Sequence, residues 1–232
     1  MRSGLPTVAR REGNAAQEAH QVMDEQAARN LLGLAEEAGQ GLRGPEANRW
    51  RDRLQHRYRE LEAGFGWLLD HGHAGEALQV AGALAEFLRA TGRVATGRAW
   101  LDRVLAADAL GEHLRAVALY QDGLLAYWQG DDEEACSLHG RSLQLARRLG
   151  DPTVTALALC GLARVALRED LDWARTLGEE ALATVAGTDD RTGRANALQV
   201  LGVAARMRGD LHEVRRLMAQ RSKLGREPGP RG

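Results

Sequence analysis

The sequence predicts an all-α protein, an α-solenoid built from antiparallel helix pairs. Residues 111–151 show the pattern best, because two stretches of helical periodicity are joined by Gly130-Asp131. Glycine ends a helix readily in the left-handed conformation, and aspartate caps the start of the next one. Similar punctuation returns at Gly92-Arg93, Glu169-Asp170 and Gly209-Asp210, at intervals of roughly 38 to 40 residues. Such a period is typical of stacked helix pairs, and we expect about ten helices.

The composition supports this fold class. Apolar residues make up 44% of the chain and aromatic residues only 4%, and valine and isoleucine are too sparse to build strands. The 31 basic and 32 acidic residues are interspersed and give a net charge of −1. This balance provides neither the basic stripe of a nucleic-acid-binding protein nor a polybasic membrane patch. We therefore expect no direct nucleic-acid partner and no membrane partner.

The cysteines and the N-terminal segment bear on location. Cys136 and Cys160 stand alone, outside any paired-cysteine spacing, and are expected as free thiols in a reducing compartment. The first residues are charged but no apolar segment follows them, and no stretch approaches the roughly 18 apolar residues of a membrane helix. These features predict a cytoplasmic protein.

One helical-repeat domain is expected over residues 15–224, between a disordered lead at 1–14 and a disordered tail at 225–232. Its first helix begins near Ala15, and the second is expected to run without a break to about Asp70. That second helix carries the strongest apolar stripe of the chain, formed by Trp50, Leu54, Tyr58, Leu61, Phe65 and Leu68. The domain is expected to contain this helix pair at 15–70 and four repeats, at 74–107, 111–149, 152–186 and 190–224.

Small residues recur at matching places in these repeats. They are Gly123, Gly161 and Gly202 in the first helices, with Ala135, Ala174 and Val214 about twelve residues later, and Ser142 and Ala181 about seven residues after those. This pattern resembles the tetratricopeptide repeat, although the repeats here are longer than its 34 residues. The resemblance implies a right-handed superhelix. Gly161 is expected to repeat the role of Gly123, so leucine at either position should overpack a close helix contact.

A second resemblance covers residues 28–106. Its cues are Leu-Arg-Gly-Pro-Glu at 42–46 with Trp50 shortly after, Trp-Leu-Leu-x-His-Gly at 67–72, and Gly-Arg-x-Trp-Leu-x-Arg-x-Leu at 97–105. This stretch resembles the region that follows the ATPase module in LuxR-type and AfsR-like bacterial transcriptional regulators. That family also has a DNA-binding helix-turn-helix, and neither module is visible here. The single lysine, Lys223, lies outside any phosphate-binding loop, so ATP hydrolysis is not expected.

In tetratricopeptide-like arrays the first helices line a concave groove. Aromatic, arginine and amide side chains there would suit an extended peptide or a small effector. The alternative is that Tyr127 and Trp128 pack between neighbouring repeats. Registering the repeats on Gly123 predicts ten groove residues: Gln79, Glu86 and Arg89 in the first repeat, Tyr120, Leu124, Tyr127 and Trp128 in the second, and Asn196, Gln199 and Arg206 in the fourth.

Other polar groups favour structural interpretations. Asp122 could bind a ligand amine, but a salt bridge to an arginine of an adjacent helix is preferred. The acidic run 131–134 lies in the first turn of a helix, where carboxylates cap N–H groups and complement the helix dipole. Cys136 with His139, and Asp70 with His71 and His73, offer too few ligands for zinc. We expect no metal, no cofactor and no enzymatic activity.

The sequence thus predicts a non-enzymatic scaffold that binds a protein or peptide partner, in bacterial transcriptional or signalling regulation. A small-molecule effector sensor that uses the same groove is the alternative, suggested by Tyr120, Tyr127 and Trp128 beside Arg89. Direct DNA binding ranks third. The sequence sets no oligomeric state.

Overall fold

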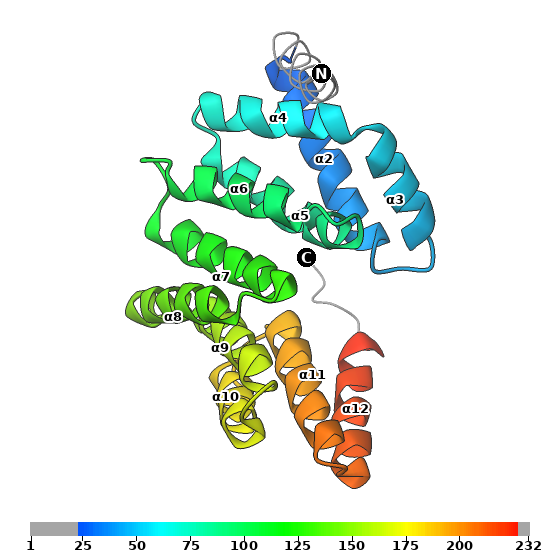
Figure 1. Cartoon of the computed structure of the whole chain (residues 1–232), viewed down its shortest axis with the longest axis vertical. Coiled ribbons are helices and arrows are strands. Elements are labelled where there is room, and N and C mark those ends of the chain that lie inside the picture. The colour runs from blue at the N-terminus through cyan, green and yellow to red at the C-terminus, as the bar shows by residue number, and fades with distance from the viewer. Residues whose placement is uncertain (1–22, 227–232) are drawn as a thin grey trace, which may run out of the picture. The chain divides into compact units, whose positions relative to one another are not determined.

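The computed structural model describes residues 23–226, and the regular structure in this range is entirely helical (Figure 1). Its eleven helices, arranged as antiparallel neighbours, confirm the predicted all-α solenoid. The predicted disordered lead at 1–14 lies outside the described residues, and so does the predicted tail from 227 to 232, whereas residues 225 and 226 of that tail belong to the last helix. The helices group into two compact units, and the chain passes from one to the other between Leu110 and Gly111. We describe each unit by itself.

The first unit contains five helices. α5 packs against α2, α4 and α6, so it lies at the centre of the unit. Large aromatic side chains fill the core. The rings of Phe65 and Trp100 stack with their centroids 4.4 Å apart. Tyr58 and Phe87 form a second aromatic contact at 6.1 Å. The helices are α2 (Glu25–Gly41), α3 (Ala47–His56), α4 (Tyr58–Asp70), α5 (Ala74–Ala90) and α6 (Val94–Leu105).

Two boundaries in this unit differ from the predictions. The predicted first helix is interrupted before Glu25, where α2 begins, because extended Asp24 precedes α2 and accepts a hydrogen bond of 2.7 Å from the Ala27 N–H; the part of the prediction before residue 23 lies outside the described residues. The second helix is not continuous, because the backbone at Arg57 separates α3 from α4. The predicted stripe still points inward: Leu54, Leu61, Phe65 and Leu68 are buried, and Trp50 and Tyr58 are half-buried.

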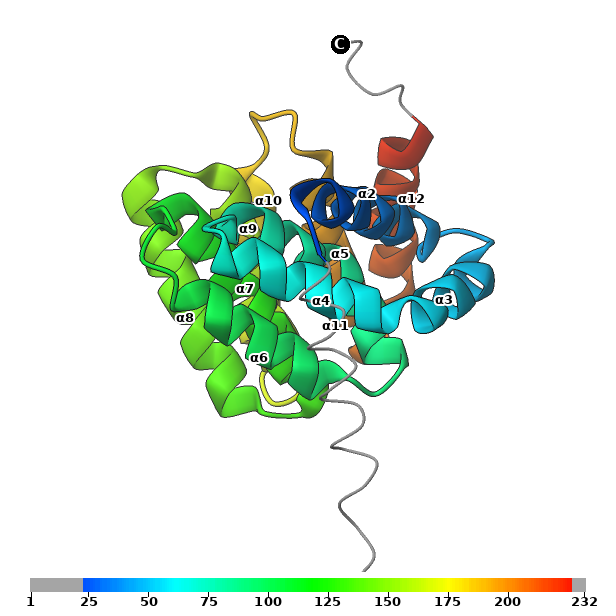
Figure 2. The ribbon, with the colours of Figure 1, turned by 90° about the horizontal axis from the view of Figure 1, so that it is seen from above.

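The second unit alternates two kinds of helix. α7, α9 and α11 are the first helices of three successive pairs, and each packs on the next of its kind. Their partners α8, α10 and α12 follow after tight turns, and α7 and α8 lie side by side in Figure 1 and Figure 2. The helices are α7 (Glu112–Gln129), α8 (Asp132–Leu149), α9 (Pro152–Ala166), α10 (Leu171–Thr184), α11 (Arg191–Met207) and α12 (Leu211–Arg226).

The turns follow the predicted chemistry. Gly130 ends α7 in the left-handed conformation, with φ of 85°, and the Asp131 carboxylate caps α8 by accepting from the Glu134 N–H. The turn between α9 and α10 has no glycine and is less regular, as predicted. Helical periodicity in the sequence also predicts that Leu149 and Leu211 lie on the buried sides of their helices. Both leucines are exposed at helix ends instead, Leu149 by 40% and Leu211 by 62%.

The predicted equivalence of Gly123 and Gly161 is wrong. A Cβ atom on Gly123 of α7 would lie 2.7 Å from the His139 ring, so this glycine faces α8, the second helix of its own pair. A Cβ atom on Gly161 of α9 would lie 2.5 Å from the same ring, so Gly161 faces α8 of the preceding pair. The two glycines therefore make room for one imidazole.

His139 is completely buried, and neither ring nitrogen has a hydrogen-bond partner within residues 23–226. Burial, with a smaller contribution from the Arg164 charge, lowers the pKa of His139 from 6.5 to about 3. Cys136 is exposed, so it does not share the environment of His139. The imidazole is a neutral packing element of the second unit.

Candidate functional site

The predicted groove residues of the first unit lie on α5. Gln79 is exposed, and Glu86 forms an ion pair with Arg89, whose Nε lies 3.0 Å from a Glu86 carboxylate oxygen. This hydrogen bond raises the pKa of Arg89. The other seven predicted residues belong to the second unit, on α7 and α11. We therefore consider them separately.

On α7, the four predicted residues Tyr120, Leu124, Tyr127 and Trp128 are half-buried. The guanidinium of Arg168 lies 4.5 Å from the centre of the Tyr127 ring and donates to the Tyr127 carbonyl at 3.4 Å. Arg168 also holds both carboxylate oxygens of Asp132, at 2.8 and 2.7 Å. Tyr127 is therefore packed by a side chain of the next repeat, in agreement with the packing alternative for this residue.

Arg164 on α9 is a groove candidate that sequence reasoning missed. Its Nη2 donates to the Asn196 side-chain oxygen at 3.5 Å, which connects α9 with α11. Its Nη1 is buried and has no hydrogen-bond partner among the described residues. A buried guanidinium N–H without an acceptor is costly, and a ligand oxygen would satisfy it.

The way in which the repeats were aligned with one another explains why Arg164 was not predicted. Alignment on Gly161 shifts the third repeat and places no polar residue in the groove. Counting from the residues that precede α7 and α9, Gly111 and Asp151, aligns Arg164 with Leu124 and Arg168 with Trp128. The start of each helix would have been the better reference for the register.

The predicted residues of α11 share one side of that helix. Asn196 is half-buried, and Gln199 and Arg206 are exposed. We define the inner surface as the side of α7, α9 and α11, with the turn after α9, that bears Tyr127, Arg164, Arg168, Asn196, Gln199 and Arg206.

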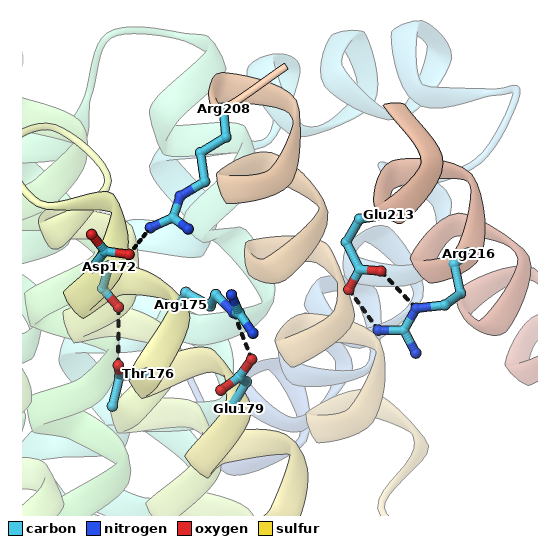
Figure 3. Close-up of polar contacts among 7 residues, drawn as sticks. All are labelled: Asp172, Arg175, Thr176, Glu179, Arg208, Glu213 and Arg216. Atoms are coloured by element: carbon cyan, nitrogen blue, oxygen red, sulfur yellow. Dashed lines mark hydrogen bonds and ion pairs between the residues drawn. The ribbon is translucent and has the colours of Figure 1, made fainter. Parts of the chain in front are cut away.

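A second surface lies on the opposite side of α11. A cavity of about 480 Å³ opens there between α10 and α12, and we call it the outer groove. Leucine and alanine side chains form its floor. Charged side chains form its walls, and four of them, Arg175, Glu179, Glu213 and Arg216, are drawn in Figure 3. Successive residues are about 100° apart around a helix, so this side of α11 faces away from Gln199. The lining residues are Arg175, Glu179, Leu182, Leu201, Ala204, Ala205, Arg208, Asp210, Glu213, Arg216, Leu217 and Gln220.

The charged walls of the outer groove are held mainly by pairs within one helix (Figure 3). Arg175 Nε lies 2.7 Å from Glu179 on α10, and Arg216 Nε lies 2.6 Å from Glu213 on α12. The Arg216 hydrogen bonds, with a smaller contribution from the charge of Arg175, lower the pKa of Glu213. Sequence reasoning did not predict this groove, because its walls come from two second helices 40 residues apart.

At one end of the outer groove, Arg208 forms an ion pair with Asp172 at the start of α10 (Figure 3). The Thr176 hydroxyl donates to the Asp172 carbonyl at 3.0 Å. Asp210 accepts a 3.0 Å hydrogen bond from the Glu213 N–H and so caps α12. The Arg208–Asp172 ion pair ties the α11–α12 turn to α10.

Other titratable groups have structural roles. The Asp131 carboxylate caps α8, and the Asp132 carboxylate binds Arg168, as described above. Asp122 is buried, with 1% of its surface exposed. Burial raises the pKa of the Cys160 thiol to about 11, so this sulfur is a poor nucleophile at neutral pH.

The histidine-rich turn after α4 is occupied by packing and ion contacts. The His71 ring stacks on Trp67 at 3.9 Å, and His73 lies 3.4 Å from Glu76. Asp70 lies 3.8 Å from Arg103. Within residues 23–226, no cluster of three or more potential ligand side chains could hold a metal ion. No helix of that range is both long enough and apolar enough to span a bilayer.

The fold and its turns define the class of protein. The family model described as "Tetratricopeptide repeat" matches residues 114–186, which cover α7 to α10. The second unit is thus a tetratricopeptide-like helical-repeat region. Repeats of this class generally bind protein partners and serve as non-catalytic scaffolds.

Particular relatives come from mycobacteria. The chain is 26% identical over 166 residues to "Putative HTH-type transcriptional regulator Rv0890c" of Mycobacterium tuberculosis, and equally to "Putative HTH-type transcriptional regulator Mb0914c" of Mycobacterium bovis. Each alignment covers 67% of this chain and 18% of the relative. The chain therefore spans less than a fifth of the length of these relatives.

Solved structures of similar fold include repeat proteins. The crystal structure of BtubC (BKLC) from P. vanneervenii matches with a TM-score of 0.57 and 17% identity, covering 98% of this chain and 96% of that one. The crystal structure of "Podosopora anserina putative kinesin light chain nearly identical TPR-like repeats" matches with a TM-score of 0.55 and 18% identity, covering 87% of this chain and 97% of that one. At these identities the likeness concerns the fold alone.

Proposed function

We propose that this chain is a non-enzymatic scaffold that binds an extended peptide segment of a partner protein on the inner surface. The observation that carries the proposal is Arg164, whose buried Nη1 has no acceptor in the part of the chain that the structure describes. Exposed Gln199 and Arg206 belong to the same inner surface. A backbone carbonyl or carboxylate of a peptide would supply that acceptor. Charge-assisted hydrogen bonds of this kind are stronger than neutral ones.

A role in transcriptional or signalling regulation is part of the proposal. It is supported by the resemblance of residues 28–106 to the arm of LuxR-type and AfsR-like regulators and by the mycobacterial relatives. A cytoplasmic location belongs to the same proposal, and the two free thiols agree with it. The ATPase and DNA-binding functions of such regulators would be supplied by modules other than this region.

The test begins with selection of peptides from a random library displayed on phage, with the full chain as bait. Calorimetric titration of a selected peptide against Arg164→Gln should show binding about 10- to 100-fold weaker, because a charged hydrogen bond is lost. Arg141→Gln, an exposed arginine of α8, is the matched control and should bind normally. Failure to enrich any peptide, or equal binding by both variants, would contradict the proposal.

A further inference from the structure

Acidic side chains are distributed unevenly between the two kinds of helix in the second unit. α9 and α11 contain four arginines and no aspartate or glutamate, whereas α8 and α10 contain three acidic residues each. On α7, Glu112 forms an ion pair with Arg148 of α8, and Asp122 is buried. The α9 and α11 part of the inner surface therefore carries positive charge without carboxylates of its own.

The carboxylates next to this part of the inner surface lie beyond the ends of the helices. The aspartates that cap α9 and α11 precede these helices, and Asp190 is about 24 Å from Arg206 along α11. One oxygen of Asp190 caps α11, and the other is buried. After the end of α9, Asp132 binds Arg168 through both oxygens, and Glu169 is exposed in the turn. Asp132 is thus engaged by Arg168, and Asp190 is far from Arg206.

Arg164 and Arg206 have no carboxylate partner in the part of the chain that the structure describes. Arg164 meets the amide oxygen of Asn196 at 3.5 Å, and its Nη1 has no acceptor. Since the whole side chain of Arg164 is only half-buried, a rotation of its guanidinium would bring Nη1 to an incoming acceptor. The Arg206 side chain is exposed, and no hydrogen bond or ion pair joins it to residues 23–226. Two guanidinium groups on this surface therefore have donors and positive charge that this range does not use.

The spacing of these two groups sets the spacing of the charges in a ligand. Asn196, which holds Arg164, lies about 15 Å from Arg206 along α11. Exposed Gln199 and half-buried Val203 lie between them on the same side, and both are uncharged. An extended peptide advances about 3.3 Å per residue. Two carboxylates about four or five residues apart in such a peptide would therefore reach both arginines.

We infer that the inner surface binds an acidic peptide segment, with one carboxylate on Arg164 and a second, about four or five residues away, on Arg206. This inference rests on the proposed function and adds the charge of the partner to it. A carboxylate accepts two parallel N–H bonds from a guanidinium and also neutralises it, whereas a neutral acceptor leaves the positive charge uncompensated. The unpaired arginines also attract an acidic segment before contact.

The first test is the composition of peptides that the full chain selects from a random phage library. Aspartate and glutamate should be enriched over the unselected library, and the enrichment should disappear in the double variant Arg164→Gln/Arg206→Gln. Arg141→Gln/Arg221→Gln, which changes exposed arginines of α8 and α12, is the matched control and should keep it. Enriched peptides without an excess of acidic residues would overturn this inference alone, whereas failure to enrich any peptide would overturn the proposed function as well.

The second test isolates the carboxylates of one selected acidic peptide. A fluorescein-labelled version with asparagine and glutamine in place of aspartate and glutamate should bind the full chain about 10- to 100-fold more weakly, because charged hydrogen bonds are lost. The double variant should bind both versions alike, and circular dichroism checks that its helices are intact. Equal binding of the two versions by the unaltered chain, or displacement of the acidic peptide by an equal concentration of free glutamate or of a short DNA duplex, would overturn the inference.

Discussion

The two units of this chain achieve helical packing by different means. In the second unit an aspartate caps each of five successive helices, by accepting from the N–H three residues further on. Among the helices described in the first unit, only α2 has such a cap, and α3 to α6 begin without a side-chain cap. The five capping residues of the second unit are Asp131, Asp151, Asp170, Asp190 and Asp210.

The cores of the two units also differ. The first unit stacks large rings, as in the Phe65–Trp100 contact. The second unit packs alanine and glycine closely around one wedged imidazole, His139. Regular caps and small residues are sequence features that repeat, whereas an aromatic core can be assembled in many ways. This difference agrees with the match of the repeat model to part of the second unit only.

The largest expected effect tests the aromatic core of the first unit. Trp100→Ala should lower the free energy of unfolding by about 3–5 kcal/mol, because Trp100 is 4% exposed and stacks on Phe65. Trp173→Ala, at a 53% exposed position of the second unit, is the matched control and should cost less than about 1 kcal/mol. Urea denaturation measures both, and similar costs would show that the stacked pair is not central to the core.

The next effect concerns pH and the second unit. His139 titrates near 6.5 when unfolded and near 3 when folded, so between these values the unfolded chain binds a proton that the folded chain does not. Stability should therefore fall on acidification, by roughly 2–3 kcal/mol between pH 6.5 and 4.5 from this group. His139→Leu should lose that part of the slope. Parallel pH profiles for the two proteins would contradict the assigned environment.

A smaller effect tests the contact of two glycines with one ring. Gly161→Ala should cost about 1–3 kcal/mol, because the new methyl group would overlap the buried His139 ring. In a His139→Ala background the same substitution should cost little. Gly140→Ala on α8 is the control: its Cβ atom would meet no neighbour, so it should stabilise by about 0.5–1 kcal/mol. Guanidinium denaturation of the four variants measures the free energies of unfolding. An equal cost of Gly161→Ala in both backgrounds would show that this cost does not come from contact with the His139 ring.

The smallest effect tests the caps. Asp170→Ala should cost about 1 kcal/mol, since the carboxylate accepts from the Trp173 N–H at 2.9 Å. Glu46→Ala, at the corresponding place before α3, removes no cap hydrogen bond and should change stability by less than about 0.5 kcal/mol. Thermal denaturation followed by circular dichroism compares them. Equal losses would show that the capping difference between the units has no energetic meaning.

The sequence predicted the helical class, the pair structure and most turns, because periodicity and Gly-Asp punctuation act locally. It did not predict the break at Arg57, where no proline or glycine stands. It placed Leu149 and Leu211 in the core, because the apolar periodicity of the sequence continues past the point where the neighbouring helix ends in the structure. The two exposed leucines show that local periodicity does not determine the length over which two helices pack against each other.

The site was harder to predict than the fold. Arg164 was missed because one glycine was taken to mark the same position in every repeat. The outer groove was missed because no sequence motif indicates where two second helices lie far enough apart to leave a cavity between them. The ten groove residues named from the sequence stay a prediction. Their roles depend on how successive repeats pack, which only the three-dimensional arrangement contains.

The most direct test of the central claim is photocrosslinking of a library-selected peptide to the full chain. Gln199 on the inner surface, or Gln220 in the outer groove, would be replaced by p-benzoylphenylalanine, and the adducts identified by mass spectrometry. The account predicts that the peptide crosslinks at position 199 and not at position 220. Crosslinking at position 220 alone, or at neither position, would contradict peptide binding on the inner surface.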